Sequence, residues 1–130
     1  MILDTSFLID VMRSEAAALA QAQQLEVEQV PQRVPGIVVF ELFVGVGHTD
    51  RCEEERDRIE SVLDARPVLD LDRQTLRKAG RIKGELMASG DDLGTGDALV
   101  GATGVVRDEP VLTRNESDFE PIPDLEVRTY

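Results

Sequence analysis

The chain has 130 residues, 26 of them acidic and 14 basic, which gives a formal net charge of −12 at pH 7. This length predicts one domain with a single core rather than two. No apolar run reaches the ~20 residues that a membrane span requires, and no basic segment leads into a long apolar stretch near the N-terminus. The lone cysteine, Cys52, excludes an internal disulfide and a cysteine-rich zinc site. We therefore expect a cytoplasmic protein with no membrane contact.

The acidic surplus by itself disfavours a nucleic-acid partner, because phosphate repels such a surface. Divalent cations that bridge carboxylates to phosphate would reverse this local repulsion. An excess of Asp and Glu over Lys is also typical of proteins from salt-loving organisms. The charge alone therefore leaves the substrate open.

Strands alternate with helices along the chain, as in an α/β fold with a parallel sheet. In chain order the predicted elements are strand 1–4, helix 5–13, helix 15–29, strand 36–39, a helix that carries Glu41, helix 51–65, strand 68–71, a helix ending near 89, helix 97–106, strand 111–113, a turn around Asp118 and strand 125–129. The predicted N-caps are Ser14, then Thr49 or Asp50, and Asp72, while Gly90 closes the helix that Asp72 opens.

Four acidic residues interrupt otherwise apolar segments or follow predicted strands: Asp4, Glu41, Asp97 and Asp118. Two such charges ~4 Å apart repel by roughly 4 kcal/mol at an effective dielectric constant of about 20. If the fold gathers all four, a divalent cation is the natural counter-ion.

Each of these acids also has an ordinary structural explanation. Asp4 could cap the following helix, and Glu41 could pair with an arginine elsewhere. Asp97 could complement a helix dipole, and Asp118 could occupy a loop turn. Neighbouring hydroxyl and amide groups favour a site, since Thr5 and Ser6 follow Asp4 and could fix its carboxylate.

Strand alternation before Asp118 predicts that Thr113 and Asn115 face one side and Arg114 the other. Thr and Asn side chains on that side could orient a carboxylate or a metal-bound water.

Several other chemistries are excluded or disfavoured. His48 is the only histidine and is predicted to be a solvated loop residue, so RNA cleavage by a histidine pair is impossible. The chain has no phosphate-binding loop of the GxxxxGK[ST] kind. Ser6 and Cys52 have no candidate base near them in the sequence, which disfavours covalent catalysis.

The four acidic segments together resemble the PIN-domain ribonucleases of the VapC toxin family. MILDTSFLIDVMR is similar to the opening strand and helix of that family, and ELFVG to its ELxxG segment. DALVGAT is similar to its DALIAAT helix, with Gly101 at a usual alanine, and TRNESDF matches its TRNxxDF segment. The resemblance runs from Met1 to about Tyr130, although residues 15–33 carry no motif of the family.

This resemblance implies a single PIN-like nuclease domain over residues 1–130, with a three-layer α/β/α fold around a parallel sheet of four to five strands. It implies a catalytic quartet of Asp4, Glu41, Asp97 and Asp118, and a Mg²⁺ or Mn²⁺ site. We expect Asp4, Asp97 and Asp118 to hold the metal, and Glu41 to bind it through water or to accept a proton. Thr5, Ser6, Thr113 and Asn115 are the expected supporting residues.

The implied activity is cleavage of RNA, often tRNA or another structured RNA, and the implied partners are a VapB-type antitoxin and a second copy of the chain. Three alternatives remain from the sequence. The first is a phospho-acceptor receiver domain, which is disfavoured because no lysine follows Lys83. The second is a PIN nuclease that processes RNA without being a toxin. The third is a catalytically silent binding protein, which the complete acidic set disfavours.

Overall fold

The protein is described from a computed structural model, which covers residues 1–47 and 50–130. Its helices are α1 (Thr5–Met12), α2 (Ala16–Val27), α3 (Gly36–Val46), α4 (Cys52–Asp64), α5 (Arg73–Ala88), α6 (Thr95–Arg107) and α7 (Glu116–Phe119). Its strands are β1 (Ile2–Leu3), β2 (Val34–Pro35), β3 (Val68–Leu69), β4 (Val111–Leu112) and β5 (Val127–Arg128). The predictions that concern His48 and Thr49 lie outside the described residues.

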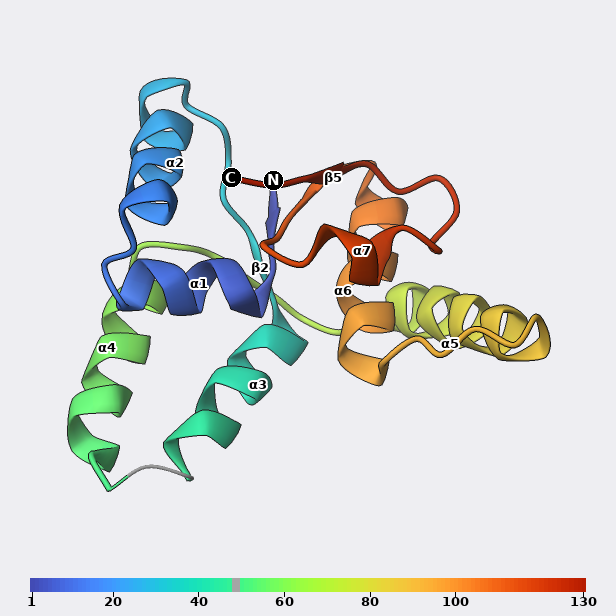
Figure 1. Ribbon diagram of the computed structural model, residues 1–130, viewed down its shortest axis with the longest axis horizontal. Helices are drawn as coiled ribbons and strands as arrows, with labels where there is room; N and C mark the ends of the chain where they lie inside the picture. The colour runs from blue at the N-terminus through green and yellow to red at the C-terminus, as the bar shows by residue number, and fades with distance from the viewer. Residues whose placement is uncertain (48–49) are drawn as a thin grey trace.

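All strand pairs are parallel. One sheet has the order β1-β4-β5 and the other pairs β2 with β3. A parallel bridge between Ile2 and Arg33 joins the two, so the five strands form one twisted layer in the order β3-β2-β1-β4-β5. Helices flank this layer (Figure 1), and the predicted α/β fold of the PIN type is confirmed. Each strand is only two residues long, shorter than predicted.

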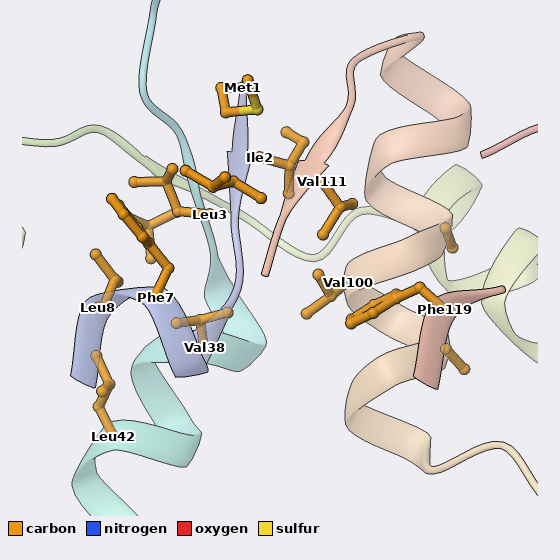
Figure 2. Packing of buried hydrophobic residues seen from close by; sticks show 14 of the residues in the cluster. Met1, Ile2, Leu3, Phe7, Leu8, Val38, Leu42, Val100, Val111 and Phe119 are labelled. Carbon is orange, nitrogen blue, oxygen red and sulfur yellow. The ribbon is translucent and has the colours of Figure 1, made fainter. Parts of the chain in front are cut away.

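The core forms where the first strand, the first helix and α6 meet. Ile2, Leu3 and Phe7 are fully buried, as are Val100 and Phe119 (Figure 2). Packing around β1 and β4 therefore fixes the position of the residue that follows each strand. None of the helices in the described part of the chain is both long and apolar enough to span a membrane.

The predicted strand over residues 36–39 is wrong, because this segment is the first turn of α3. Its β-branched residues suggested a strand, but Val38, Leu42 and Val46 are buried at a spacing of four, which is a helical period. Pro35 lies at the N-cap position. A Cβ on Gly36 would lie 3.1 Å from the carbonyl oxygen of Leu69, so the helix begins in close contact with β3.

Two predicted caps are also wrong. Ser14 has a φ of 58° and precedes α2 without capping it, since Glu15 occupies the N-cap position. Arg51 rather than Asp50 occupies the N-cap position of α4. By contrast, the Asp72 side chain accepts a hydrogen bond from the Thr75 amide, and Gly90 follows α5 with a φ of 83°, as predicted.

Candidate active site

The candidate site lies at the carboxyl edge of the sheet, where ligands bind in parallel α/β folds. Asp4 follows β1 and Thr113 follows β4, and these two strands are hydrogen-bonded neighbours. The Asp4 amide donates to the carbonyl oxygen of Leu112 at 3.0 Å, which continues the pairing one residue past the strands. The first and the last of the four acidic segments in the sequence therefore meet at this edge.

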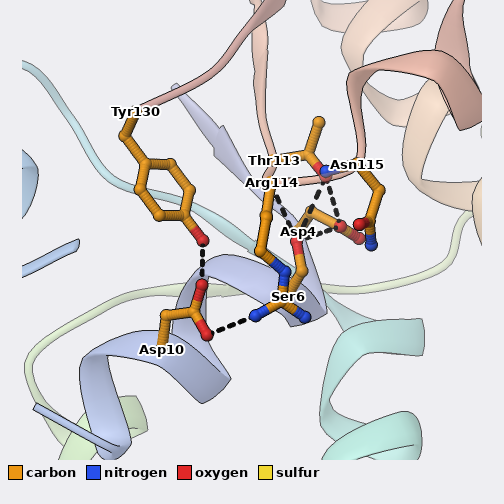
Figure 3. Close-up of polar contacts among 7 residues, drawn as sticks. All are labelled: Asp4, Ser6, Asp10, Thr113, Arg114, Asn115 and Tyr130. Atoms are coloured by element: carbon orange, nitrogen blue, oxygen red, sulfur yellow. Dashed lines mark hydrogen bonds and ion pairs between the residues drawn. The ribbon is translucent and has the colours of Figure 1, made fainter. Parts of the chain in front are cut away.

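Asp4 is buried, with 6% of its surface exposed, and two hydroxyl groups hold its carboxylate. Ser6 Oγ and Thr113 Oγ1 each donate to Asp4 Oδ2 at 2.8 Å (Figure 3). Asp4 lies at the N-cap position of α1, but its side chain makes no capping hydrogen bond. The capping explanation for this carboxylate is therefore wrong, and its orientation is set by residues expected to support a site.

Glu41 projects from α3 toward the start of α6. Thr5 Oγ1 donates to Glu41 Oε1 at 2.9 Å, so the prediction that Thr5 would fix the Asp4 carboxylate is wrong. No arginine among the described residues pairs with the Glu41 carboxylate. A Cβ on Gly96 would lie only 2.8 Å from Glu41 Oε2, so the Glu41 carboxylate lies directly against the start of α6 and would have to move if Gly96 carried a side chain. Burial raises the pKa of Glu41, the hydrogen bond from Thr5 opposes that rise, and the charge of Asp4 adds to it.

Asp97 lies in the first turn of α6, half-buried, one residue after the glycine that contacts Glu41. Burial, followed by the charges of the three other acids, raises the pKa of Asp97 from 3.8 to about 6. Asp118 is exposed on α7 and is one of those charges. The fold therefore brings all four predicted acids into electrostatic contact.

No lysine or arginine among the described residues forms an ion pair with any member of this quartet. In the same part of the chain, no three acidic, histidine or cysteine side chains form a ready-made metal-binding group. The carboxylates are thus close enough for their charges to raise the pKa of Asp97 and of Glu41, but they are not arranged around one common point. Such an arrangement suits a cation that is bound partly through water.

The supporting residues lie where strand alternation placed them. Thr113 faces Asp4, and its hydroxyl also accepts from the Asn115 amide at 3.0 Å. The Asn115 side chain lies on the Asp4 side in Figure 3, whereas that of Arg114 lies on the other side. The Arg114 amide donates to Ser6 Oγ at 3.1 Å, which ties the chain after β4 to the start of α1.

One buried network beside the site was not predicted. Asp10 on α1 is 4% exposed; it pairs with Arg114 Nη1 at 2.5 Å and accepts a hydrogen bond from the Tyr130 hydroxyl at 2.6 Å (Figure 3). The Tyr130 ring packs edge-on against Phe7, with ring centroids 5.1 Å apart. The sequence contains one sign of this network: Asp10 lies between Ile9 and Val11 in an apolar helix, as Glu41 lies between apolar residues.

Comparison with known proteins assigns this arrangement to a family. The model of the PIN domain matches residues 1–125. The chain belongs to the PIN-domain family. A Ribonuclease VapC of Rickettsia bellii (strain RML369-C) is 30% identical over 135 residues, which cover 99% of this chain and 95% of the relative. The tRNA(fMet)-specific endonuclease VapC of Salmonella typhimurium is 24% identical, over 98% of this chain and 96% of the relative.

Solved structures of this family share the fold. VapBC2 from Rickettsia felis, bound to a DNA fragment from its promoter, superimposes with a TM-score of 0.91 at 19% identity and covers 99% of this chain and 97% of the matched chain. DNA-bound VapBC from Salmonella typhimurium gives a TM-score of 0.89 at 23% identity, with 98% and 96% covered. The resemblance to VapC proteins inferred from the sequence is confirmed, and the relatives and structures named here are VapC or VapBC proteins.

Proposed function

We propose that this PIN-domain chain is a metal-dependent endoribonuclease and the toxin of a VapBC-type toxin–antitoxin system, acting in the cytoplasm. The observation that carries the proposal is the quartet of carboxylates at the carboxyl edge of the sheet, none of which forms an ion pair with a described lysine or arginine. Its relatives named as ribonucleases cover nearly the whole chain and support the activity. We propose a structured RNA, such as a tRNA, as the substrate class.

The site fits a hard divalent cation. Its donors are carboxylate oxygens, which suit Mg²⁺ or Mn²⁺ better than zinc. Asp4, Asp97 and Asp118 would hold the cation, and Glu41 would contact it through water or accept a proton. When bound, such a cation lowers the pKa of coordinated water and offsets the charge of the phosphodiester.

The surrounding residues have positioning roles. The Ser6 and Thr113 hydroxyls fix the rotamer of Asp4, because both donate to the same oxygen. Thr5 does the same for Glu41 from the first residue of α1. Asp97, with its pKa near 6, retains a proton more readily than a free aspartate until a cation or substrate changes its surroundings. Such preorganised polar groups cost no rearrangement during reaction.

A cleft beside Glu41 supports the proposed antitoxin partner. It lies between α1, α3 and α4, and its lining combines Ile9, Met12 and Leu42 with the basic Arg13 and Arg58. Because it opens next to a catalytic carboxylate, a peptide segment bound there would block access to the site. This mode of inhibition is the one we propose for a VapB-type antitoxin.

An exposed apolar face on α3 supports the proposed homodimer. Phe40 is 65% exposed and Val44 is 46% exposed, and both line a shallow hollow with Val39 and Phe43. Contiguous apolar surface of this kind marks protein interfaces. Replacing Phe40 with serine should shift the mass measured by light scattering from dimer to monomer, whereas an unchanged dimer mass would contradict the assignment of this face.

The activity is tested by incubating the purified protein with total tRNA in the presence of Mg²⁺, Mn²⁺ or EDTA. We expect cleavage with either metal, none with EDTA, and none for Asp97→Asn, whose fold is checked by circular dichroism. Undiminished cleavage by Asp97→Asn would exclude the proposed site. Growth arrest on expression, relieved by the protein encoded beside the gene, distinguishes a toxin from an RNA-processing nuclease.

A further inference from the structure

The basic residues of this acidic chain are concentrated on one helix. Helix α5 carries five of the fourteen basic residues, including both lysines, but only one of the 26 acidic residues, Glu85. The rest of the protein is therefore even more acidic than the net charge of −12 suggests. A surface of the opposite sign in such a molecule attracts polyanions.

We propose that the outward face of α5 binds the phosphate backbone of the RNA substrate. This inference rests on the proposed nuclease function and names a surface through which a long RNA is held. The face is defined by Arg73, Arg77 and Arg81, which are all exposed, together with Gly80 and Gly84. We refer to it below as the arginine face.

The periodicity of α5 places these residues together. Thr75, Ala79 and Ile82 are buried, and α5 packs extensively along α6. At 100° per residue, the three arginines and the two glycines project from the opposite side of the helix. A shallow groove runs beside them, lined also by Lys78 and by Val106 of α6.

The charges of the arginine face are available to a ligand. Arg73 and Arg77 form no ion pair with any described residue, and Arg81 pairs only with Glu85 at 2.9 Å, in a contact where both side chains are exposed. An exposed pair of this kind contributes at most about 1 kcal/mol, so a phosphate can replace the carboxylate. Arginine is also the better side chain for a phosphate, because its planar fork donates two parallel hydrogen bonds.

The two glycines are a second, independent observation. A Cβ at Gly80 or Gly84 would meet nothing within 4 Å, so no neighbour in the described chain requires a glycine there. Glycine in an exposed helix interior is less favourable than alanine. Two such residues flanking a line of arginines therefore indicate close approach by another molecule, which a Cβ would hinder.

The arginine face lies within reach of an RNA held at the acidic quartet. Figure 1 shows α5 beside α6, on the side of the molecule away from α2 and α4. The Lys83 ammonium donates to the carbonyl oxygen of Leu93, just before the helix whose first turn carries Asp97. Val106, which lines the groove, lies nine residues beyond Asp97 along α6, about 13 Å at 1.5 Å per residue. At a rise of about 3.4 Å per nucleotide in a helical strand, that length corresponds to about four nucleotide steps.

The separation between Asp97 and the arginine face means that only a long RNA contacts both. An RNA of a few nucleotides would occupy the acidic site without reaching the arginine face, whereas a folded RNA of tRNA size would contact both. The face therefore contributes to binding of long RNA and not to the chemical step. Like charges also disfavour the same face of a second copy as the occupant, since two such surfaces would repel each other.

The test compares Arg77→Gln with the matched control Arg56→Gln, and adds the triple variant Arg73→Gln, Arg77→Gln, Arg81→Gln. Arg56 is an exposed helical arginine on α4, without an ion pair to any described residue. All three are measured in an Asp97→Asn background, with unfractionated tRNA as the probe and the dissociation constant recorded across a salt series. Cleavage of tRNA and of an RNA of about three nucleotides, shorter than the four steps to the groove, is measured in the active background.

We expect Arg77→Gln to lower the slope of log K against log salt by about 0.7–0.9, and the triple variant by about 2–3, with weaker tRNA binding at fixed salt on the order of tenfold. Cleavage of the short RNA should stay at the wild-type rate, which shows that the active site is intact. Equal slopes for Arg77→Gln, the triple variant and Arg56→Gln would overturn the proposal. Failure of the unmodified protein to cleave any RNA would instead contradict the proposed function.

Two further measurements separate this role from the alternatives. The double variant Gly80→Ala, Gly84→Ala should melt at a higher temperature yet bind tRNA more weakly, a combination that a purely structural role does not produce. Unchanged tRNA binding in that variant would count against the close approach. If the triple variant loses binding to polyglutamate or changes its oligomeric mass while tRNA binding is unaffected, the face serves a protein partner and the RNA proposal is wrong.

Discussion

Replacing Asp97 with asparagine should stabilise the metal-free protein at neutral pH while removing its activity. Burial of the half-buried Asp97 side chain, and then the charges of the three other carboxylates, raise its pKa from 3.8 to about 6. At 1.36 kcal/mol per pKa unit this is about 3 kcal/mol against the charged form. Because the side chain is only half-buried, solvent screening reduces the expected effect to about 1–2 kcal/mol.

The pH dependence follows from the direction of this change. Above pH 6 the folded protein holds Asp97 ionised at a pKa higher than in the unfolded chain, so the full penalty applies. As the pH falls through 6 toward 3.8, the folded state binds a proton that the unfolded state does not, and the penalty disappears. The stability advantage of Asp97→Asn should therefore fall to about half at pH 5.

The assay is urea unfolding in EDTA at pH 7.5 and pH 5, followed by circular dichroism. Asp57→Asn is the control, because Asp57 is an exposed acid on α4 away from the site and its replacement should change stability at neither pH. Millimolar Mg²⁺ should stabilise the unmodified protein and Asp97→Asn much less. An Asp97→Asn variant that is equally or less stable than the unmodified protein at pH 7.5 in EDTA would refute the electrostatic reasoning.

Four further substitutions test contacts beside the site and in the core. Thr113→Val removes one of the two hydroxyl groups that donate to the buried Asp4 carboxylate. We expect the free energy of unfolding to fall by about 1–2 kcal/mol and the rate of RNA cleavage to fall about 10–100-fold. A cleavage rate within twofold of normal would exclude the positioning role. Asp10→Asn weakens a buried ion pair whose arginine is half exposed, so the free energy of unfolding should fall by about 1–3 kcal/mol, and an unchanged melting curve would show that the pair contributes nothing. Gly104→Ala brings a Cβ within 2.9 Å of a backbone carbonyl oxygen and should lower the free energy of unfolding by about 1–3 kcal/mol. At Gly101 the nearest atom is the tip of an isoleucine side chain that can move, so Gly101→Ala should destabilise the protein less. A larger loss of stability for Gly101→Ala than for Gly104→Ala would contradict this packing.

The fold class and the four acids could be predicted from the sequence because both depend on local patterns. A carboxylate inside an apolar segment is conspicuous, and the order of strands and helices identifies a parallel sheet. The strand prediction for residues 36–39 is wrong because a short run of β-branched residues fits a buried strand and a buried helix equally well. Only the contact of Gly36 with β3 and the spacing of Val38 and Leu42 distinguish the two.

The parts of the site that escaped sequence analysis depend on distant contacts. Asp10, Arg114 and Tyr130 lie on three different segments, and no local pattern joins them. The sequence predicted that Ser6 would hold Asp4, but the convergence of Ser6 and Thr113 on one oxygen of Asp4 required the geometry of β1 beside β4. The contact of Thr5 with Glu41 instead of Asp4 depends on the packing of α1 on α3, which no local pattern shows. The arginine face was visible in the sequence only as a concentration of basic residues, and its outward direction follows from the packing of α5 on α6.

The most direct measurement of the central claim is the binding of Mn²⁺, followed by the loss of its free-ion electron paramagnetic resonance signal. We predict that the unmodified protein binds Mn²⁺, that Mg²⁺ competes for the same site, and that Asp4→Asn, Asp97→Asn and Asp118→Asn each weaken the affinity while Asp57→Asn leaves it unchanged. Equal Mn²⁺ affinity in Asp97→Asn and the unmodified protein would contradict a shared cation at these carboxylates.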